Sequence, residues 1–478
     1  MKKYLALILG VVFVLGFAAS AFAIHAEIPA ETQAVTAKGA SQITIGGEIR
    51  FRGDYQNNNT DFNKDLGDYK QYYDSRIRLS VDAQVTPNTE GFIQVEAGSD
   101  VDGNKSSDVF VWGNSTKDPN NPGTGSSNAS GIYNVGDAKR GTFSVLQGWI
   151  LYKGSGLLGV PAGVKIGHMP LALGNSLFFD HTKYGDDAIV VFADPMKELH
   201  ISLLAIKFRE GNLSFSDDAD GYVALGVYNF DKNSSVSGDA TFVNDQTGAP
   251  VGGTHATSFP IHFWNFGLRG NTNISGFGLK ADGELQAGKI DHTATALRGD
   301  LKFNGYAFLF GANYKLEPVM LGLDFAYGSG PKDTTHEDKL GSFVTSQSAI
   351  QHYTYVYDYR TVNACGQQYG GLCNTWYVKL SADADLMKDL RANVSGYWLN
   401  AVKDNKVALA NGTSTTGTSK KIGLELDANV QYKIDRNLTY WVEGGYLFAE
   451  GFFDTVTPTG VHGSSNAYSV RHGIQLSF

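Results

Sequence analysis

The chain has 478 residues, 42% of them hydrophobic, and a formal net charge of −9 at pH 7. This charge is modest and negative, and no basic patch or base-stacking motif accompanies it, which argues against a nucleic-acid-binding protein. Glycine, tyrosine and phenylalanine are abundant (57, 24 and 28 residues), whereas only 12 prolines occur. Such a composition is typical of a protein with many strands and girdles of aromatic residues.

The first 23 residues have the pattern of a secretory signal peptide. Lys2 and Lys3 precede an apolar run over residues 5–18, and a small-x-small cleavage site ends at Ala23. The run is shorter than the roughly 20 residues that a spanning helix needs. No other stretch approaches that length without a charge, so we expect no membrane helix in the mature chain. Residues 24–41 are small and polar without alternation, and we expect them to form a lightly packed periplasmic N-terminal tail.

Alternation of apolar and polar residues begins at residue 42. The first two predicted strands, residues 42–55 and 72–85, each place apolar side chains on one face and charged side chains on the other. The Asn/Asp-rich residues 56–68 form an outer loop between them, and residues 86–89 form a tight turn. The polar face of the first strand carries Thr44, Gly46, Glu48, Arg50, Arg52 and Asp54, and that of the second carries Asp74, Arg76, Arg78, Ser80, Asp82 and Gln84.

The same period of two recurs along nearly the whole chain. It predicts further strands at residues 91–98, 141–153, 163–168, 188–193, 199–209, 222–230, 263–273, 276–289, 302–315, 319–328, 375–385, 390–400, 422–432, 440–448 and 468–478. A single-chain barrel with both ends in the periplasm needs an even number of strands. A weakly patterned strand at residues 237–245 satisfies this condition and gives about eighteen strands, with sixteen as the alternative.

Two stretches are long enough to be large loops. Residues 100–140 are rich in Asn, Ser, Gly and Pro, and form either a flexible outer loop or one that folds inward and narrows a pore. Residues 329–374 are expected to form one long outer loop. It contains Cys365 and Cys373, the only two cysteines, and in an exported protein we expect them to form a disulfide that closes a short loop.

A soluble antiparallel sheet with one wet face gives the same alternation. Three features favour a membrane barrel instead: the pattern covers most of the chain, the polar face is densely charged while the apolar face is almost uncharged, and a signal peptide precedes it. We therefore predict an all-β fold in which residues 42–478 form a single transmembrane antiparallel barrel, with long outer loops and short periplasmic turns, in the outer membrane of a Gram-negative-type bacterium. Eighteen strands leave a water-filled lumen.

Several segments, in this order, resemble the alginate-export family of outer-membrane porins. They are residues 164–168, 188–191, 266–270, 284–288, 305–306 and 324–330, followed by the Gly-x-Glu-x-Asp strand of residues 423–427, Tyr432, residues 443–448 and Gly451. The resemblance covers most of the barrel and implies an eighteen-stranded barrel that passes solutes without energy input. His168 and Met169 stand where the family usually has Arg and Gln.

The alternation also predicts which side chains line the pore. The candidate pore-lining residues are Glu48, Arg50, Arg52, Asp54, Asp74, Arg76, Arg78, Asp82, Glu96, Lys165, Arg269, Glu284, Arg391, Glu425, Asp427, Glu443 and Arg471. Arg50, Arg52, Arg76 and Arg78 lie on neighbouring strands. They form either a basic ladder that screens solutes or a salt-bridged scaffold with Glu48, Asp74 and Asp82. Both signs of charge are present without a cation surplus, which is unlike the cationic pore that a polyanion exporter requires.

The predicted function is that of a porin for passive diffusion of small hydrophilic or charged solutes. A structural sheath for a partner such as a multihaem cytochrome, or an alginate-like polysaccharide exporter, is the alternative. We expect no enzyme, because no nucleophile motif occurs and His168, His200 and His262 have no evident partner in sequence. No metal or cofactor is expected, since the cluster of Asp180, His181, Asp186 and Asp187 matches no ligand spacing. The expected partners are the outer-membrane lipid bilayer, small hydrophilic solutes and the barrel assembly machinery.

Overall fold

The computed structural model describes residues 34–38, 41–98, 110–112, 143–156, 159–211, 217–247, 259–291, 299–332, 338–347, 353–368, 370–409, 412–457 and 460–478. The signal peptide predicted at residues 1–23, much of the expected N-terminal tail and most of the loop at residues 100–140 lie outside these described residues. Within the described parts of the chain, no helix is long and apolar enough to cross a membrane.

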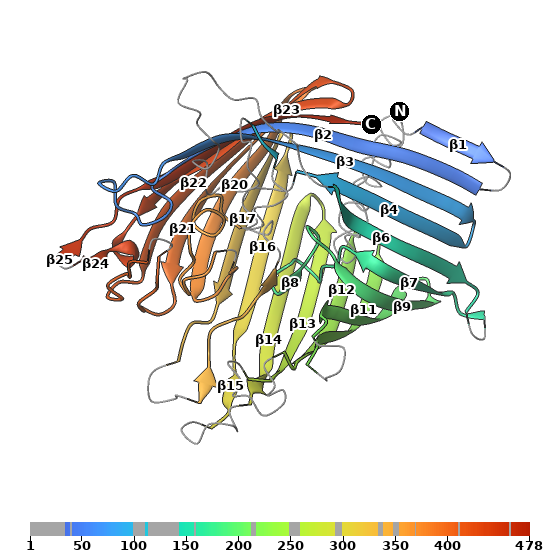
Figure 1. Ribbon diagram of the computed structural model, residues 1–478, viewed down its shortest axis with the longest axis horizontal. Helices are drawn as coiled ribbons and strands as arrows, with labels where there is room; N and C mark the ends of the chain where they lie inside the picture. Colours follow the sequence, from blue (N-terminus) through green and yellow to red (C-terminus); the bar gives the residue numbers. More distant parts are fainter. Residues whose placement is uncertain are drawn as a thin grey trace, which may run out of the picture.

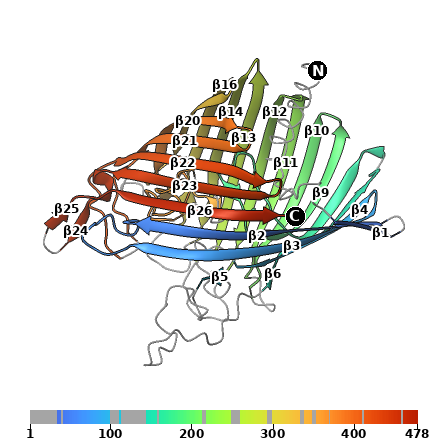
Figure 2. The ribbon, with the colours of Figure 1, turned by 90° about the horizontal axis from the view of Figure 1, so that it is seen from above.

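Eighteen antiparallel strands form one closed barrel. Each strand pairs with its neighbours along the chain, and the last strand pairs with the first to close the ring (Figures 1 and 2). The barrel strands are β2 (Ser41–Asn57), β3 (Lys70–Thr86), β4 (Thr89–Ala97), β6 (Phe143–Gly154), β7 (Ala162–Met169), β9 (Asp186–Met196), β10 (Leu199–Arg209), β11 (Ala219–Asp231), β12 (Ser234–Asp245), β13 (Ile261–Ile274), β14 (Phe277–Ile290), β16 (Tyr306–Leu316), β17 (Val319–Gly328), β20 (Thr375–Met387), β21 (Leu390–Ala401), β22 (Lys421–Asp435), β23 (Leu438–Ala449) and β26 (Ala467–Ser477).

The predicted all-β barrel of about eighteen strands is therefore confirmed, and the weakly patterned stretch contains a barrel strand, β12. One predicted strand is wrong in its extent. Residues 302–315 do not form a single strand, because the chain is interrupted after β15 (Leu301–Phe303) and resumes as β16. At the break, β15 pairs with a distant two-residue strand, β18 (Lys339–Leu340), so residues 301–303 bind a loop as well as β14.

The residues before the barrel also differ from expectation. Within the expected tail, β1 (Ala34–Lys38) forms an antiparallel pair with the first residues of β2 (Figure 2). The last strand, β26, pairs with β2 as far as Glu48, and Phe478 exchanges two backbone hydrogen bonds with Gly47, so the edge of β2 before Gly47 would be open. β1 covers this edge, and in this way satisfies backbone groups that an open sheet edge would leave unpaired.

The side chains of the wall follow the period of two. On β2, Ile43, Ile45 and Phe51 are 39–42% exposed on the outer surface, whereas Arg50 and Asp54 on the opposite face are 7% and 2% exposed. Apolar side chains thus point outward and charged ones inward, the reverse of a water-soluble protein. Outward aromatic rings also pack in pairs, such as Phe242 with Trp264 at a centroid separation of 4.6 Å.

The two ends of the barrel differ. At one end, called here the turn end, most neighbouring strands are joined by tight turns; at the other, the loop end, the connections are long. One such connection contains β5 (Phe110–Val111), which pairs with β3 and is followed by Trp112, whose indole donates to Ser75 Oγ at 2.6 Å. Another contains a 3-10 turn (Gly451–Phe453) and the hairpin of β24 (Thr455–Thr457) and β25 (Gly460–His462), which projects beyond the strands in Figure 1.

Two of the long connections fold into the lumen. The first, called loop A, comprises residues 170–185, joins β7 to β9 and contains β8 (Phe179–Asp180). The second, called loop B, comprises residues 329–374, joins β17 to β20 and contains β18 and β19 (Ser346–Gln347). Loop A packs its buried side chains, including Leu173 and Phe178, against inward apolar residues of the wall such as Val190 and Ile206. The main apolar core of the molecule therefore lies inside the barrel, between a loop and the wall.

Candidate functional site

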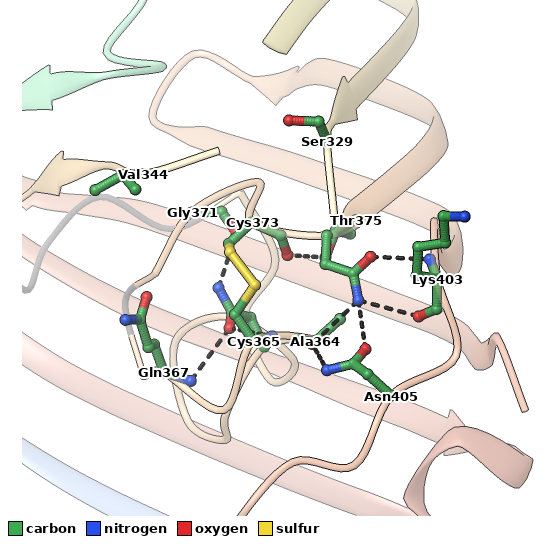
Figure 3. Close-up of a disulfide and its surroundings, with 12 residues drawn as sticks. Ser329, Val344, Ala364, Cys365, Gln367, Gly371, Cys373, Thr375, Lys403 and Asn405 are labelled. Carbon is green, nitrogen blue, oxygen red and sulfur yellow. Dashed lines mark hydrogen bonds between the residues drawn. A yellow bond between two sulfur atoms is a disulfide. The ribbon is translucent and has the colours of Figure 1, made fainter. Parts of the chain in front are cut away.

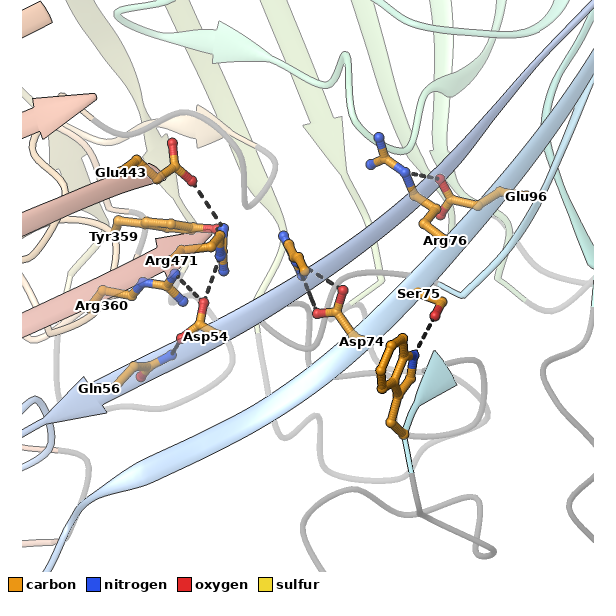
Figure 4. A network of polar contacts seen from close by, with 12 residues as sticks. Asp54, Gln56, Asp74, Ser75, Arg76, Glu96, Tyr359, Arg360, Glu443 and Arg471 are labelled. Carbon is orange, nitrogen blue, oxygen red and sulfur yellow. Dashed lines mark hydrogen bonds and ion pairs between the residues drawn. The ribbon is translucent and has the colours of Figure 1, made fainter. Parts of the chain in front are cut away.

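The arginines of β2 and β3 face inward, and the described contacts pair them with acids of the neighbouring strands. Arg52 donates through Nε and Nη2 to Asp74 at 2.6–3.0 Å. Arg76 binds Glu48 at 2.5 Å. Figure 4 shows Arg76 also directed toward Glu96, at 3.9 Å. This interleaving of signs corresponds to the salt-bridged scaffold rather than to an open basic ladder.

The remaining residues of this wall are placed in the same way. Arg78 donates to Glu96 at 2.6 Å, while Arg50 lies buried in the same inward row. Asp82 is half-buried near the turn end and lines a cavity there. The rigid pairing of these side chains holds the charge pattern of the wall in a fixed arrangement.

A second ion cluster joins loop B to the seam where the barrel closes (Figure 4). Asp54 of β2 accepts hydrogen bonds from Arg471 of β26 at 2.6 Å and from Arg360 of loop B at 2.8 Å. Arg471 also donates to the Tyr359 hydroxyl at 2.8 Å and lies 3.8 Å from Glu443. All three charged partners of the central contact are almost fully buried, so this interaction is strong and geometrically specific.

The acids predicted to line the pore on β22 hold the backbone of loop B. Glu425 accepts the N–H of Val356 at 2.5 Å and the N–H of Tyr357 at 2.9 Å. Asp427 accepts the N–H of Tyr355 at 3.0 Å. Two carboxylates thus replace the strand partners that residues 355–357 lack, and their main role is to anchor the loop.

Arg269 performs the corresponding role beneath loop A. Its guanidinium contacts Asp239, lies 2.5 Å from Glu284 and lies 3.3 Å from Asp282. Asp282 in turn accepts the backbone and side-chain N–H groups of Asn175 in loop A, both at 3.1 Å. One cation with three carboxylates therefore forms a buried network that positions the loop.

Loops A and B also bind each other. Strand β8 of loop A pairs in parallel with β19 of loop B. His181 Nδ1 lies 2.8 Å from Asp186, and its Nε2 lies 3.0 Å from Ser346 Oγ across the junction. From the wall, Gln286 exchanges two hydrogen bonds with the backbone of Val344, at 2.7 and 2.9 Å. The described parts of the two loops are consequently joined to each other and to the wall inside the barrel.

A cavity of about 380 Å³ lies between residues of loops A and B and the wall of β14 to β23. We call it the constriction cavity. Its charged lining consists of Lys280, Lys379, Asp324, Asp358, Asp427 and Glu443, and its uncharged polar lining includes Tyr353, Tyr397, Asn393 and Asn429. Lys280 and Asp324 form an ion pair at 3.2 Å. The cavity is thus polar, with charges of both signs and more acids than bases.

Two predicted pore-lining residues have other surroundings. Lys165 is 3% exposed, and its ammonium lies 3.7 Å from the centroid of the Trp149 ring. Arg391 lies at the turn end, where 60% of its side chain is exposed and Asp383 is 3.7 Å away. The first is buried in the wall and the second borders the mouth of the barrel, so neither belongs to the constriction cavity.

The cysteines form a disulfide within loop B, with Cα atoms 5.9 Å apart (Figure 3). Beside it, Asn374 donates to the carbonyls of Ala364 and Lys403 and to the side chain of Asn405, at 2.6–3.2 Å. These contacts fix the end of loop B against the connection after β21.

The histidines have partners that the sequence did not reveal. His168 lies 2.9 Å from Asp187, and His262 lies 3.5 Å from Asp291. His200 lies 2.7 Å from Asp194 and 2.8 Å from Ser202 Oγ. Each pair forms only when two strands come together, and among the described residues no group of three or more potential ligands is arranged to hold a metal ion.

Solved structures of similar architecture are known. The chain is similar to the outer membrane protein OpdK from Pseudomonas aeruginosa (11% identity, 91% of this chain and 98% of that chain, TM-score 0.50). It is also similar to OprD (9% identity, 91% and 94%, TM-score 0.50) and to OccK5 (10% identity, 91% and 98%, TM-score 0.50) from the same organism. The chain has a porin fold.

No protein-family model matches the chain, and no curated protein matches it by sequence. The coarser part of the predicted resemblance, to an outer-membrane porin barrel, is thus supported by the fold. Membership of the alginate-export family specifically stays a prediction.

Proposed function

We propose that the protein is a passive channel of the outer membrane, through which small hydrophilic solutes diffuse. The observation that carries this proposal is the closed barrel with an apolar exterior and a charged interior, narrowed by loops A and B to a polar cavity. An apolar outer surface fits lipid, and a closed barrel leaves no unpaired sheet edge in it. The signal peptide predicted at residues 1–23 forms part of the proposal, since such a barrel must be exported.

The same geometry argues against the alternatives. A sheath needs an open lumen for its protein partner, whereas described parts of loops A and B occupy the lumen, at the β8–β19 pair and at the contact of Arg360 with Asp54. An exporter of a polyanion needs a surplus of cations, whereas the lining of the constriction cavity has two lysines against three acids, even without the fully buried Asp358. Paired charges of both signs largely cancel at a protein–water boundary, so we infer weak ion selectivity with a slight preference for cations.

Planar-bilayer recordings of the purified protein test this function. We expect stable single-channel conductance and a small reversal potential in a KCl gradient, with the sign of a cation preference. Lys280→Gln should move that potential further toward cations, because it leaves Asp324 without its 3.2 Å partner. Lys315→Gln, at an exposed turn, is the matched control. Protein that leaves bilayers non-conducting and liposomes impermeable to small sugars would refute the proposal.

A further inference from the structure

A second cavity, of about 680 Å³, lies inside the barrel on the turn-end side of loop A. Its apolar lining includes Leu151, Val190 and Phe192 of the wall together with Leu171 of loop A. Its polar lining includes the acids Asp82, Glu90 and Asp194 of β3, β4 and β9, together with Lys153 and His200. The cavity therefore has the character of a site for a molecule with an apolar body and a polar end.

Lys165 of β7 lines this cavity, and its ammonium differs from the other buried cations. It is 3% exposed, and the Trp149 ring covers it from one side at 3.7 Å. Among the described residues, no carboxylate lies within 4.0 Å of it and no group accepts its hydrogen bonds. In contrast, Arg52, Arg269 and Arg471 each have a carboxylate within that distance. Buried charges are normally paired, and an aromatic face attracts a cation from one side only.

We propose that this cavity binds an amphiphilic monoanion, such as a medium-length aliphatic carboxylate, with its head group on Lys165 Nζ. The ammonium offers three donors, which a carboxylate accepts. The aliphatic body would replace water against Leu171 and Phe192. The acids of the lining repel a second negative charge on the ligand, so a single charge is favoured. A short anion would leave the apolar side unused, and a cationic amphiphile would meet Lys165 with the same sign.

Binding of the anion at this cavity does not require that the protein conducts. A role of the bound anion in transport, however, rests on the proposed channel function. The cavity lies inside the barrel, where a solute that crosses the channel could contact it. Lys165 would then select amphiphilic anions among the solutes that the wider lumen admits. The site would act as a specific step within an otherwise weakly selective channel.

Isothermal titration of octanoate into the purified full-length protein tests the site. We expect saturable 1:1 binding to the wild type, and an affinity roughly ten- to a hundredfold lower for Lys165→Met, the range for losing a hydrogen bond to a charged group. Lys153→Met, which removes an exposed lysine in the lining of the same cavity, should bind octanoate like the wild type. Lys165→Arg should keep the binding, which separates loss of charge from a failure to fold.

Acetate and octylammonium serve as matched probes, and both should bind far more weakly than octanoate. The inference is overturned if the wild type shows no saturable octanoate binding, if Lys165→Met binds it as well, or if acetate binds equally. Potassium conductance of the same preparations separates the two proposals. Conduction without octanoate binding would refute the binding site and support the channel. Lys165-dependent octanoate binding without conduction would support the binding site and refute the channel.

Discussion

Glu425 offers the most direct test of how loop B is held. Glu425→Gln keeps the size of the side chain, but a carboxamide can accept only one of the N–H groups of Val356 and Tyr357, and its NH2 group opposes the other. The variant therefore leaves one of these two buried N–H groups without an acceptor, which costs about 1–3 kcal/mol. The attachment of the loop should weaken by this amount, since both donors are buried.

This loss corresponds to a roughly 5- to 140-fold shift toward the detached loop, at about 1.4 kcal/mol per factor of ten. Hydrogen exchange of the amides of residues 355–357 measures the detachment directly, because exchange reports local opening. We also expect larger or more fluctuating single-channel currents. Glu317→Gln is the matched control, since 79% of that side chain is exposed at a turn. Unchanged exchange at residues 355–357 in Glu425→Gln would refute the anchoring role.

Three further predictions concern the inner loops. Gly174→Ala should lower the free energy of unfolding in urea by about 1–3 kcal/mol, as expected for overpacking, because an added Cβ would clash with the Arg269 guanidinium at a φ of +56°. Gly159→Ala is the control, since Gly159 has a positive φ but an added Cβ would have nothing within 4 Å, and it should cost less. Equal losses in the two variants would contradict the close contact at Gly174. Burial raises the pKa of the Asp358 carboxyl well above its ordinary value, so the folded loop holds this proton more tightly than the unfolded chain does. The local stability of loop B should therefore fall as the pH rises from about 4 to the raised pKa, by up to about 1.4 kcal/mol per pH unit. Hydrogen exchange measured at several pH values gives this local stability, and its dependence on pH should be weaker in Asp358→Asn. The same dependence in both proteins would exclude the effect. Replacing both Cys365 and Cys373 by Ser should lower the local stability of loop B by about 2–3 kcal/mol, because the short loop is no longer closed. Hydrogen exchange at residues 363–374 should therefore be faster, while the melting temperature of the barrel stays the same. A lower melting temperature would show that the disulfide stabilises more than loop B.

Much of the barrel could be predicted from the sequence because lipid-facing and inward residues alternate strictly along each strand. The alternation predicts that Arg50, Arg52 and Asp54 face inward, and they are buried on the inner face of β2. Ion pairing between neighbouring strands, as between Arg52 and Asp74, follows once the register is known. The disulfide partners were predictable because only two cysteines occur.

The inward course of the loops could not be predicted in the same way. It depends on contacts between residues far apart in the chain, such as the bonds from the backbone of residues 355–357 to Glu425. A signal was present, however. Residues 188–192 of β9 are apolar on both faces of the strand, and an inward apolar face such as that of Ala188 and Val190 needs a cover. Likewise, the interruption at residues 304–305 reflects a partner strand, β18, that local pattern does not reveal.

The apolar inner face of β9 to β11 has a consequence for engineering this scaffold. Val190, Ile206 and Val223 are buried because loop A covers them. Deleting or shortening loop A to obtain a wider pore would expose these apolar side chains to water and create an inner surface prone to non-specific hydrophobic binding. A successful redesign must therefore exchange the inward residues of these three strands for polar ones together with the loop, so the loop and its wall are best treated as one exchangeable part.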